Sequence, residues 1–166
     1  VSDDRQSGLA VSPDGKWVVF QADHGGDEMY DLYAVPVAGG DVVNLTQTPD
    51  ISETEALFSK DGATLAFAAK RKADAGANVA AMGWADRKVR VLTAEAAPDF
   101  TWSPVGWLGT DLVANRRNVG RTLGGVWRVP LAGGAAVSLT DPKAKAMIQA
   151  SDVSPDGKLI AVSSDA

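Results

Sequence analysis

Short apolar stretches separated by polar turns recur along this chain at a nearly constant interval. Four turn segments begin with serine and end with glycine three residues later: Ser12-Pro-Asp-Gly15, Ser59-Lys-Asp-Gly62, Ser103-Pro-Val-Gly106 and Ser154-Pro-Asp-Gly157. Proline fixes φ at its position, aspartate can bond the nearby backbone, and glycine accepts a positive φ, so each segment predicts a tight turn. The turns follow one another after 47, 44 and 51 residues. A period of this length indicates an array of similar units.

A β-hairpin is predicted around each turn. The strand before the turn is expected at Gly8–Val11, Glu55–Phe58, Asp99–Trp102 and Ala150–Val153. The strand after the turn is more hydrophobic and is expected at Trp17–Phe20, Leu65–Phe67, Leu112–Ala114 and Leu159–Val162. β-Branched and aromatic residues bounded by turn signals are typical of such strands.

The rest of the unit predicts two further strands. Residues 35–46 return as residues 129–140, identical at eight of twelve positions. Alternating apolar residues in 32–35 and 126–129 predict a third strand, and a fourth follows an Ala-Gly-Gly turn and ends at Leu-Thr. In the second unit residues 82–87 replace that turn, but Val89, Leu92 and Thr93 keep the spacing of 47 residues.

Four antiparallel strands in about 47 residues predict one blade of a β-propeller. The fold class is therefore all-β, an incomplete propeller of about three and a half blades: 8–46, 54–93, 98–140 and the half-blade 150–164. A β-sandwich is the alternative fold, but it does not explain two turn motifs kept in phase. Because propellers usually close with four to eight blades, we expect a segment of a longer chain, produced by truncation or proteolysis. The alternative is self-association of two copies through their open blade edges.

The segment Ser12-Pro-Asp-Gly-Lys-Trp-Val-Val-Phe20, followed by the Gly-Gly turn and the Leu-Thr end, resembles the repeats of two families. One is the TolB-type periplasmic propellers. The other is the propeller of the prolyl oligopeptidase family of serine peptidases, which includes acylaminoacyl and dipeptidyl peptidases. The peptidase resemblance implies a noncatalytic propeller that restricts substrate access to an α/β-hydrolase domain of the same parent chain. The TolB resemblance implies a surface that binds another protein, and it favours a periplasmic or secreted location.

Bulk composition excludes several kinds of function. The chain has no cysteine, which excludes disulfides and thiolate metal sites. Its formal net charge of -5 argues against a nucleic-acid partner, which needs a basic surface. No apolar run approaches the roughly 20 residues of a membrane span.

Catalytic chemistry is not predicted in this segment. A serine hydrolase needs a Gly-x-Ser-x-Gly elbow and a histidine base, and the chain has no such elbow and a single histidine, His24. We therefore predict no catalytic residue, no cofactor and no metal ligand here. A third hypothesis, a hydrolase or lectin site in the central channel, finds little support because the first strands are apolar and small. The Gly39-Gly40 and Gly133-Gly134 pairs lack the strand-to-helix context of a phosphate loop and are predicted to be turns.

Two sets of polar loop residues are candidates for binding. Asp23, His24, Asp27 and Glu28 could form a cation site or contact a peptide amino terminus, but the spacing does not match a calcium loop, and a solvated connection is favoured. The basic clusters Lys70–Lys72 and Arg116, Arg117 and Arg121 occupy equivalent loops, where solubilising charge is favoured. Their arginines could also bind a substrate carboxylate or a phosphate through two hydrogen bonds. Because insertions in these loops would reach a neighbouring domain, Arg116 and Arg117 are the candidates for an interdomain contact.

The five tryptophans are interpreted mainly as packing residues. Trp17, Trp102 and Trp127 fall on predicted strands, where propellers bury aromatic side chains between blades. Trp84 and Trp107 fall in irregular segments and are candidates for exposure.

Overall fold

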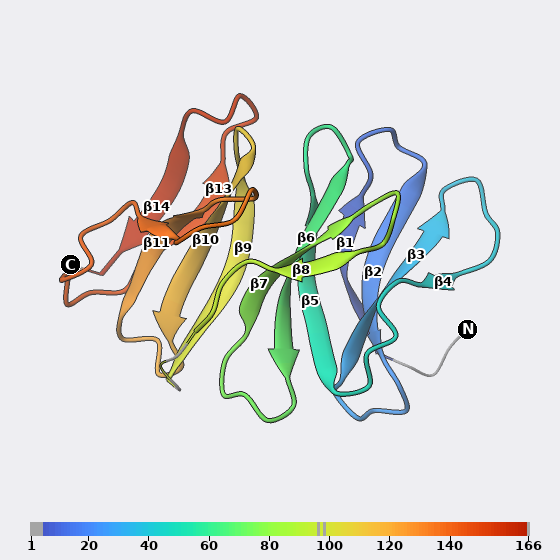
Figure 1. Cartoon of the computed structure of the whole chain (residues 1–166), viewed down its shortest axis with the longest axis horizontal. Helices are drawn as coiled ribbons and strands as arrows, with labels where there is room; N and C mark the ends of the chain where they lie inside the picture. The colour runs from blue at the N-terminus through green and yellow to red at the C-terminus, as the bar shows by residue number, and fades with distance from the viewer. Residues whose placement is uncertain (1–4, 96, 98, 166) are drawn as a thin grey trace.

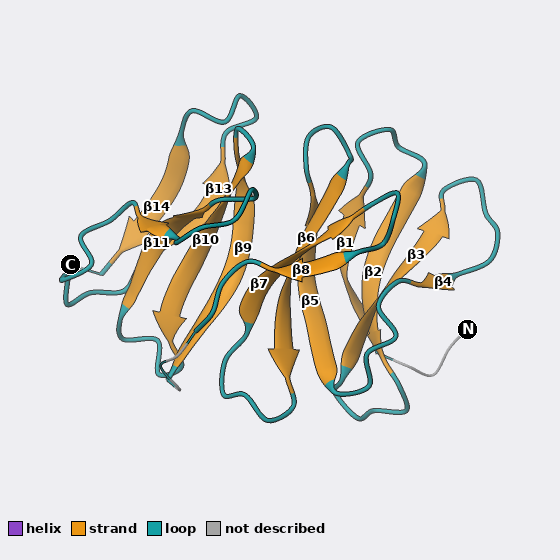
Figure 2. Ribbon diagram, viewed as in Figure 1, coloured by secondary structure: helices purple, strands orange, loops and turns teal. Residues whose placement is uncertain are grey.

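The computed structural model describes residues 5–95, 97 and 99–165, and in this part of the chain it contains fourteen strands and no helix (Figure 2). The strands form three four-stranded antiparallel sheets and one two-stranded sheet, with the strands in chain order within each sheet. The sheets lie side by side from the N-terminal to the C-terminal end (Figure 1). The chain is thus an all-β, incomplete propeller of about three and a half blades, as predicted from the sequence.

Each sheet is one blade. The first blade consists of β1 (Gln6–Val11), β2 (Trp17–Asp23), β3 (Tyr30–Pro36) and β4 (Val43–Asn44). The second consists of β5 (Ile51–Phe58), β6 (Thr64–Arg71), β7 (Asn78–Gly83) and β8 (Val89–Val91). The third consists of β9 (Phe100–Leu108), β10 (Asp111–Asn118), β11 (Gly124–Val129) and β12 (Val137–Ser138). The half-blade consists of β13 (Ile148–Val153) and β14 (Ile160–Ser164).

The repeated serine and aspartate hold the hairpin turns by the same two hydrogen bonds. In the first blade the Ser12 hydroxyl donates to Asp14 at 2.6 Å and accepts the backbone N–H of Trp17 at 2.9 Å. The pairs Ser59–Asp61 and Ser154–Asp156 repeat the first bond at 2.6 Å. Ser59 and Ser154 also repeat the second, accepting at 2.9 Å the N–H of Thr64, the first residue of β6, and that of Leu159, the residue before β14. The motif therefore fixes where each second strand begins.

The prediction of a turn at Ser103-Pro-Val-Gly106 is wrong. This segment lies inside β9, which continues to Leu108. Val105 stands where the other turns have aspartate, so it supplies no carboxylate for the serine hydroxyl. Val105 is instead the extra residue of a β-bulge, since Pro104 pairs with Ala114 and Gly106 with Val113. The chain reverses at Gly109 and Thr110, and Gly109 has the positive φ of +65° that the first position of a type II′ turn requires.

The Leu-Thr repeat holds the short fourth strand against the third. The hydroxyl oxygens of Thr46, Thr93 and Thr140 accept backbone N–H groups of the third strands from Leu32 (3.1 Å), Val79 (2.9 Å) and Val126 (3.2 Å). The leucine before each threonine donates its own N–H to the carbonyl of the same third-strand residue at 2.7–2.8 Å. A fourth strand of only two or three residues is thereby tied down at its end.

The hydrophobic core lies between neighbouring blades. Three clusters succeed one another: Val19, Leu32 and Ala34 against Leu65, Phe67, Ala80 and Met82; Ala66 and Val79 against Trp102, Leu112, Ala114 and Val129; and Val113 and Val126 against Ala150. In each cluster one face of a blade covers the opposite face of the next. Burying such side chains contributes roughly 1.5–3 kcal/mol each, so contact between blades supplies much of the stability.

All five tryptophans pack in or against this core, including the two for which exposure was suggested. Trp102 is buried and meets Trp127 edge-on, with ring centroids 5.5 Å apart, and Trp17 packs against the first cluster. These contacts confirm the interpretation of the three as packing residues. The suggestion that Trp84 and Trp107 are exposed is wrong, because both are half-buried against the clusters. Trp84 fills the space between Trp17 and Phe58, at centroid distances of 6.0 and 4.8 Å.

The first blade has one face that no other blade covers within the described residues. The β2–β3 pairs Val18–Val35 and Phe20–Tyr33 correspond in register to Leu65–Met82 and Phe67–Ala80 of the second blade, which are buried by the first. On the first blade the same positions are only half-buried, and Leu9 and Val11 of β1 are 78% and 59% exposed.

Candidate binding face

The loops between second and third strands lie along one edge of the molecule. The β2–β3 and β6–β7 loops occupy the lower edge in Figure 1, and the β4–β5 and β8–β9 connections reach the same edge. The β1–β2, β5–β6 and β9–β10 turns lie along the opposite edge. We call the first edge the connection face. The polar residues singled out from the sequence lie in these loops or at the strand ends beside them. The placement of both basic clusters in loops is wrong in part, because Lys70 and Arg71 end β6, and Arg116 and Arg117 lie on β10.

The acidic loop of the first blade is held by its own hydrogen bonds. Asp23 is buried at the end of β2 and accepts the backbone N–H of Arg5 at 2.8 Å. Asp27 accepts the N–H groups of His24 at 3.4 Å and Met29 at 2.9 Å. His24 and Glu28 are exposed. The loop is thus a hydrogen-bonded connection, and the described residues contain no group of three or more histidine, cysteine or acidic side chains placed to hold a metal ion.

Asp31, near the start of β3, caps the end of β4 through hydrogen bonds. One of its oxygens accepts the Thr46 hydroxyl at 3.1 Å and the Thr48 N–H at 3.0 Å, and the other accepts the Asn44 amide at 2.7 Å. Burial by itself would raise the pKa of Asp31, but the hydrogen bonds from Asn44 and the two threonines outweigh it and lower the pKa. Asp31 therefore stays ionised.

Glu53, at the start of the second blade, is in the opposite situation. Its side chain is 3% exposed, it accepts the Thr48 hydroxyl, and its Oε2 has no hydrogen-bond partner. Burial raises the pKa of Glu53 to about 7, although the Thr48 hydrogen bond opposes this; the nearby charge of Asp31 raises the pKa further. The contact between the first two blades therefore contains a carboxyl group that takes up a proton near neutral pH.

The second blade repeats the cap with an amide. Asn78 lies 47 residues after Asp31, and its Oδ1 accepts the Thr93 hydroxyl at 2.9 Å and the Glu95 N–H at 2.8 Å. This cap positions Glu95, whose side chain reaches the third blade. The roles of Asp31, Asn78 and Glu95 were not predicted from the sequence, although the constant distance of 15 residues from Asp31 to Thr46 and from Asn78 to Thr93 was a usable signal.

Arg116 is bound to Glu95 through two hydrogen bonds. Nε lies 2.7 Å from one carboxylate oxygen and Nη2 lies 3.0 Å from the other, while the guanidinium covers the Phe100 ring at 3.9 Å. The Trp102 indole also donates to Glu95, at 2.7 Å. Burial would raise the pKa of Glu95, but these bonds outweigh it and lower the pKa. Arg116 thus joins the second and third blades in a fixed orientation.

The other basic residues of the connection face are freer. Lys70, Arg71, Lys72 and Arg121 are exposed, and Arg71 pairs with Asp74 at 2.8 Å. Arg117 follows Arg116 on β10 and is half-buried, and its backbone lies opposite Gly124 in the pairing of β10 with β11. An interdomain contact by Arg116 and Arg117 stays a prediction.

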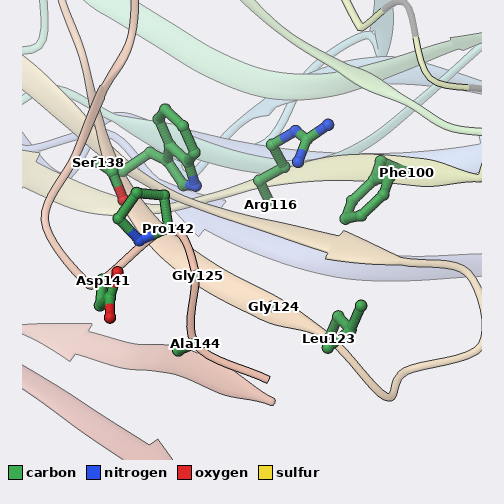
Figure 3. A pocket seen from close by; sticks show the side chains of 10 residues that line it. Phe100, Arg116, Leu123, Gly124, Gly125, Ser138, Asp141, Pro142 and Ala144 are labelled. Carbon is green, nitrogen blue, oxygen red and sulfur yellow. The ribbon is translucent and has the colours of Figure 1, made fainter. Parts of the chain in front are cut away.

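Two hollows open on this face at equivalent places in successive blades. The second-blade hollow, of about 310 Å³, is lined by Ile51, Ala69, Arg71, Asp74, Asn78, Val91, Thr93, Ala94 and Glu95. The third-blade hollow, of about 100 Å³, is lined by Phe100, Arg116, Leu123, Gly124, Gly125, Trp127, Ser138, Asp141, Pro142 and Ala144 (Figure 3). Ala69 and Arg116, Asn78 and Gly125, and Glu95 and Pro142 are each 47 residues apart. The second and third blades therefore have a hollow at the same place in the repeat, with different walls.

This architecture defines the chain as part of a β-propeller with a polar, hollowed connection face. No protein-family model matches it, and no curated protein matches its sequence. In the described residues no helix is long and apolar enough to cross a membrane.

Solved structures share the fold. TolB from Acinetobacter baumannii aligns with a TM-score of 0.71 and 20% identity over 97% of this chain and 38% of its own. Prolyl oligopeptidase B from Galerina marginata aligns with a TM-score of 0.69 and 13% identity over 92% of this chain and 23% of its own. An oligogalacturonate lyase in complex with manganese aligns with a TM-score of 0.56 and 13% identity over 84% of this chain and 49% of its own. The resemblance to TolB and prolyl oligopeptidase propellers is thus confirmed at the level of the fold, and the chain spans less than half of each of these proteins.

Proposed function

We propose that this chain is a noncatalytic propeller segment that binds a protein surface through its connection face. The observation that carries the proposal is the pair of equivalent hollows. Glu95 lines one and Arg116 lines the other, and the ion pair between them holds both side chains in place. A preorganised arginine loses little side-chain entropy on binding, and arginine and aromatic residues are enriched at protein interfaces. The exposed side chains of Lys70, Lys72 and Arg121 supply charge around the hollows.

The first candidate partner is an α/β-hydrolase domain of the same parent chain. The similarity to prolyl oligopeptidase B supports this partner, and the function is then to restrict which substrates reach a serine-peptidase active site. In this arrangement Arg116 and Arg117 face the hydrolase domain, and Arg117 is the more available of the two because Glu95 already engages Arg116.

The second candidate partner is a separate protein. In this case the chain is a protein-interaction module of the TolB kind. The higher sequence identity to TolB, 20% against 13% for the peptidase, favours this candidate.

Site-specific photo-crosslinking tests the proposal in cells that make the full-length parent protein. A benzophenone amino acid replaces Arg121 on the connection face or, as the matched control, Lys16 on the opposite edge; both positions are exposed. We expect crosslinks from position 121 and none from position 16. Peptide mapping distinguishes the partners, since a crosslink within one polypeptide identifies the hydrolase domain and a crosslink to a second polypeptide identifies a separate protein. Equal crosslinking at the two positions, or none at position 121, contradicts the proposal.

A further inference from the structure

Two carboxyl groups meet where the β4–β5 connection passes from the first blade to the second. Asp31 belongs to β3 and Glu53 to β5, and the Thr48 hydroxyl lies between them. This hydroxyl is within hydrogen-bond distance of Glu53 Oε1 and lies 3.4 Å from Asp31 Oδ1. A hydroxyl has a single hydrogen to donate. With both groups ionised, the two carboxylates therefore compete for one hydrogen.

A proton on Glu53 Oε1 removes this competition. The protonated carboxyl group donates to the Thr48 oxygen, and the Thr48 hydrogen is then free to point to Asp31. The three side chains thereby form a chain of hydrogen bonds that runs in one direction. Glu53 Oε2, which has no hydrogen-bond partner in the described part of the chain, becomes an uncharged carbonyl oxygen. An unpaired carbonyl oxygen costs far less to bury than an unpaired charge.

The surroundings of Glu53 supply no positive charge to replace this proton. The groups packed around it are Asp31 from β3, the hydroxyls of Thr46 and Thr48 from the β4–β5 connection, and Ala69, which lies opposite Glu53 in the pairing of β5 with β6. Among the described residues, no lysine or arginine forms an ion pair with either carboxyl group. Burial raises the pKa of Glu53 to about 7, whereas hydrogen bonds, which outweigh burial, lower the pKa of Asp31. Glu53 is therefore the group that gives up the proton.

Thr48 connects this proton to the start of the second blade. Its backbone N–H donates to Asp31 at 3.0 Å, and its carbonyl accepts the N–H of Ile51 at 3.0 Å. Ile51 is the first residue of β5 and lines the second-blade hollow. When Glu53 ionises, its charge and that of Asp31 repel each other across the Thr48 hydroxyl. Because β3 and β5 are held by strand pairing, the repulsion acts mainly on the connection between them.

We propose that Glu53, Thr48 and Asp31 form a proton-controlled latch on the β4–β5 connection. With the proton in place, the chain of hydrogen bonds holds residues 46–50 against both blades. When the proton leaves for solvent, the Thr48 hydroxyl keeps one carboxylate partner and loses the other. The connection then loosens, together with the Ile51 wall of the second-blade hollow. The latch requires no partner at the connection face, so its test is independent of the crosslinking result.

The next pair of blades contains an equivalent cap without a titrating pair. Forty-seven residues further on, Asn78 replaces Asp31, Glu95 replaces Thr48 and Phe100 replaces Glu53. The Glu95 N–H donates to the neutral Asn78 amide at 2.8 Å. The Glu95 carboxylate stays ionised near neutral pH, because its hydrogen bonds, those from Arg116 first, outweigh burial and lower its pKa. The Glu95 amide is therefore a matched internal control for the Thr48 amide.

Backbone hydrogen exchange of the 166-residue chain tests the latch, followed residue by residue by NMR and corrected for the intrinsic rate at each pH. We expect the protection of the Thr48 and Ile51 amides to fall by about tenfold or more between pH 5.5 and pH 8. The protection of the Glu95 amide should change by less than about threefold. Unchanged protection at Thr48 overturns the proposal. So does a parallel loss at Thr48 and Glu95, since it means that the whole chain loosens.

Two substitutions identify the group responsible. Glu53→Gln still donates a hydrogen bond toward Thr48 but cannot ionise, so it should keep the Thr48 protection of pH 5.5 up to pH 8. Asp50→Asn removes an exposed carboxylate from the same connection and, as the matched control, should show the same loss as the unaltered chain. A Glu53→Gln chain that still loses protection overturns the proposal. If this variant does not fold, the ¹³Cδ resonance of Glu53 in the unaltered chain replaces it. Its titration midpoint should agree with that of the Thr48 protection within about half a pH unit, and a larger separation overturns the proposal.

Discussion

Glu53 shows how a single buried side chain connects proton uptake to the contact between blades. The pKa of its carboxyl group rises from 4.5 to about 7 on folding. Between these two pH values the unfolded chain has released the proton and the folded chain retains it. The contribution of this group to the free energy of unfolding is therefore highest at or below about pH 4.5 and falls as the pH rises to 7. The total loss is about 3 kcal/mol, since one pKa unit is worth about 1.4 kcal/mol.

Glu53→Gln should remove this pH dependence, because glutamine stays neutral in the same place. We expect the variant and the unaltered chain to have similar unfolding free energies at pH 5. At pH 8 the variant should be more stable by about 2–3 kcal/mol, as read from urea titrations. Asp50→Asn, an exposed substitution in the same β4–β5 connection, serves as the control and should change little at either pH. A difference between Glu53→Gln and the unaltered chain that is the same at both pH values would show that Glu53 is not the group responsible.

At this scale the sequence pointed to some site residues but not to their partners. Arg116 was singled out as part of a basic cluster, and the structure shows it bound to Glu95, 21 residues earlier. Glu95 replaces a threonine of the first blade, so the repeat gives it no recurring pattern. The burial of Glu53 was equally hidden, because a carboxylate side chain is usually exposed, and here its burial depends on how two blades pack.

At the scale of the elements, the hairpins were predictable wherever the residue chemistry of the turn was complete. Ser12, Ser59 and Ser154 are each followed two residues later by aspartate, and all three segments form the expected turn. The third segment has valine in that place, and the strand runs on through it into a bulge. The serine and glycine that all four segments share were therefore insufficient to predict a turn, and the aspartate was the informative residue.

The threonine after each fourth strand should stabilise its blade through its hydroxyl group. Thr93→Val keeps the shape but removes the hydroxyl that accepts the Val79 N–H and donates to Asn78, leaving buried polar groups without partners. We expect a loss of about 1–3 kcal/mol in the free energy of unfolding, measured by urea titration. Thr93→Ser restores the hydroxyl and should recover most of it. Thr110→Val, in an exposed turn, should cost less than about 0.5 kcal/mol. A loss in Thr93→Val no larger than in Thr110→Val would mean that the hydroxyl does not hold the fourth strand.

At the scale of the whole molecule, the repeat was enough to predict the architecture. Its period and turn motifs predicted four strands per blade, and the tryptophans on predicted strands indicated packing between blades, which the three clusters show. The hollows were not predictable in this way. They depend on how the side chains of neighbouring strands and connections pack, as the different volumes of about 310 Å³ and 100 Å³ at equivalent places in the second and third blades show.

The uncovered face of the first blade makes association of the isolated chain the expected behaviour. Leu9 and Val11 are exposed beside the stacked pair Phe20 and Tyr33, whose ring centroids lie 5.7 Å apart, and the equivalent face of the second blade is buried. An apolar patch of this kind on a sheet favours contact with another sheet. We expect sedimentation velocity to show concentration-dependent association between about 5 and 200 µM. The double substitution Leu9→Lys and Val11→Lys should shift the chain toward monomer without lowering its unfolding free energy, whereas Val119→Lys on the connection face should not. If the unaltered chain is monomeric over this range, or if Val119→Lys has the same effect as the double substitution, the first-blade face is not where the copies meet.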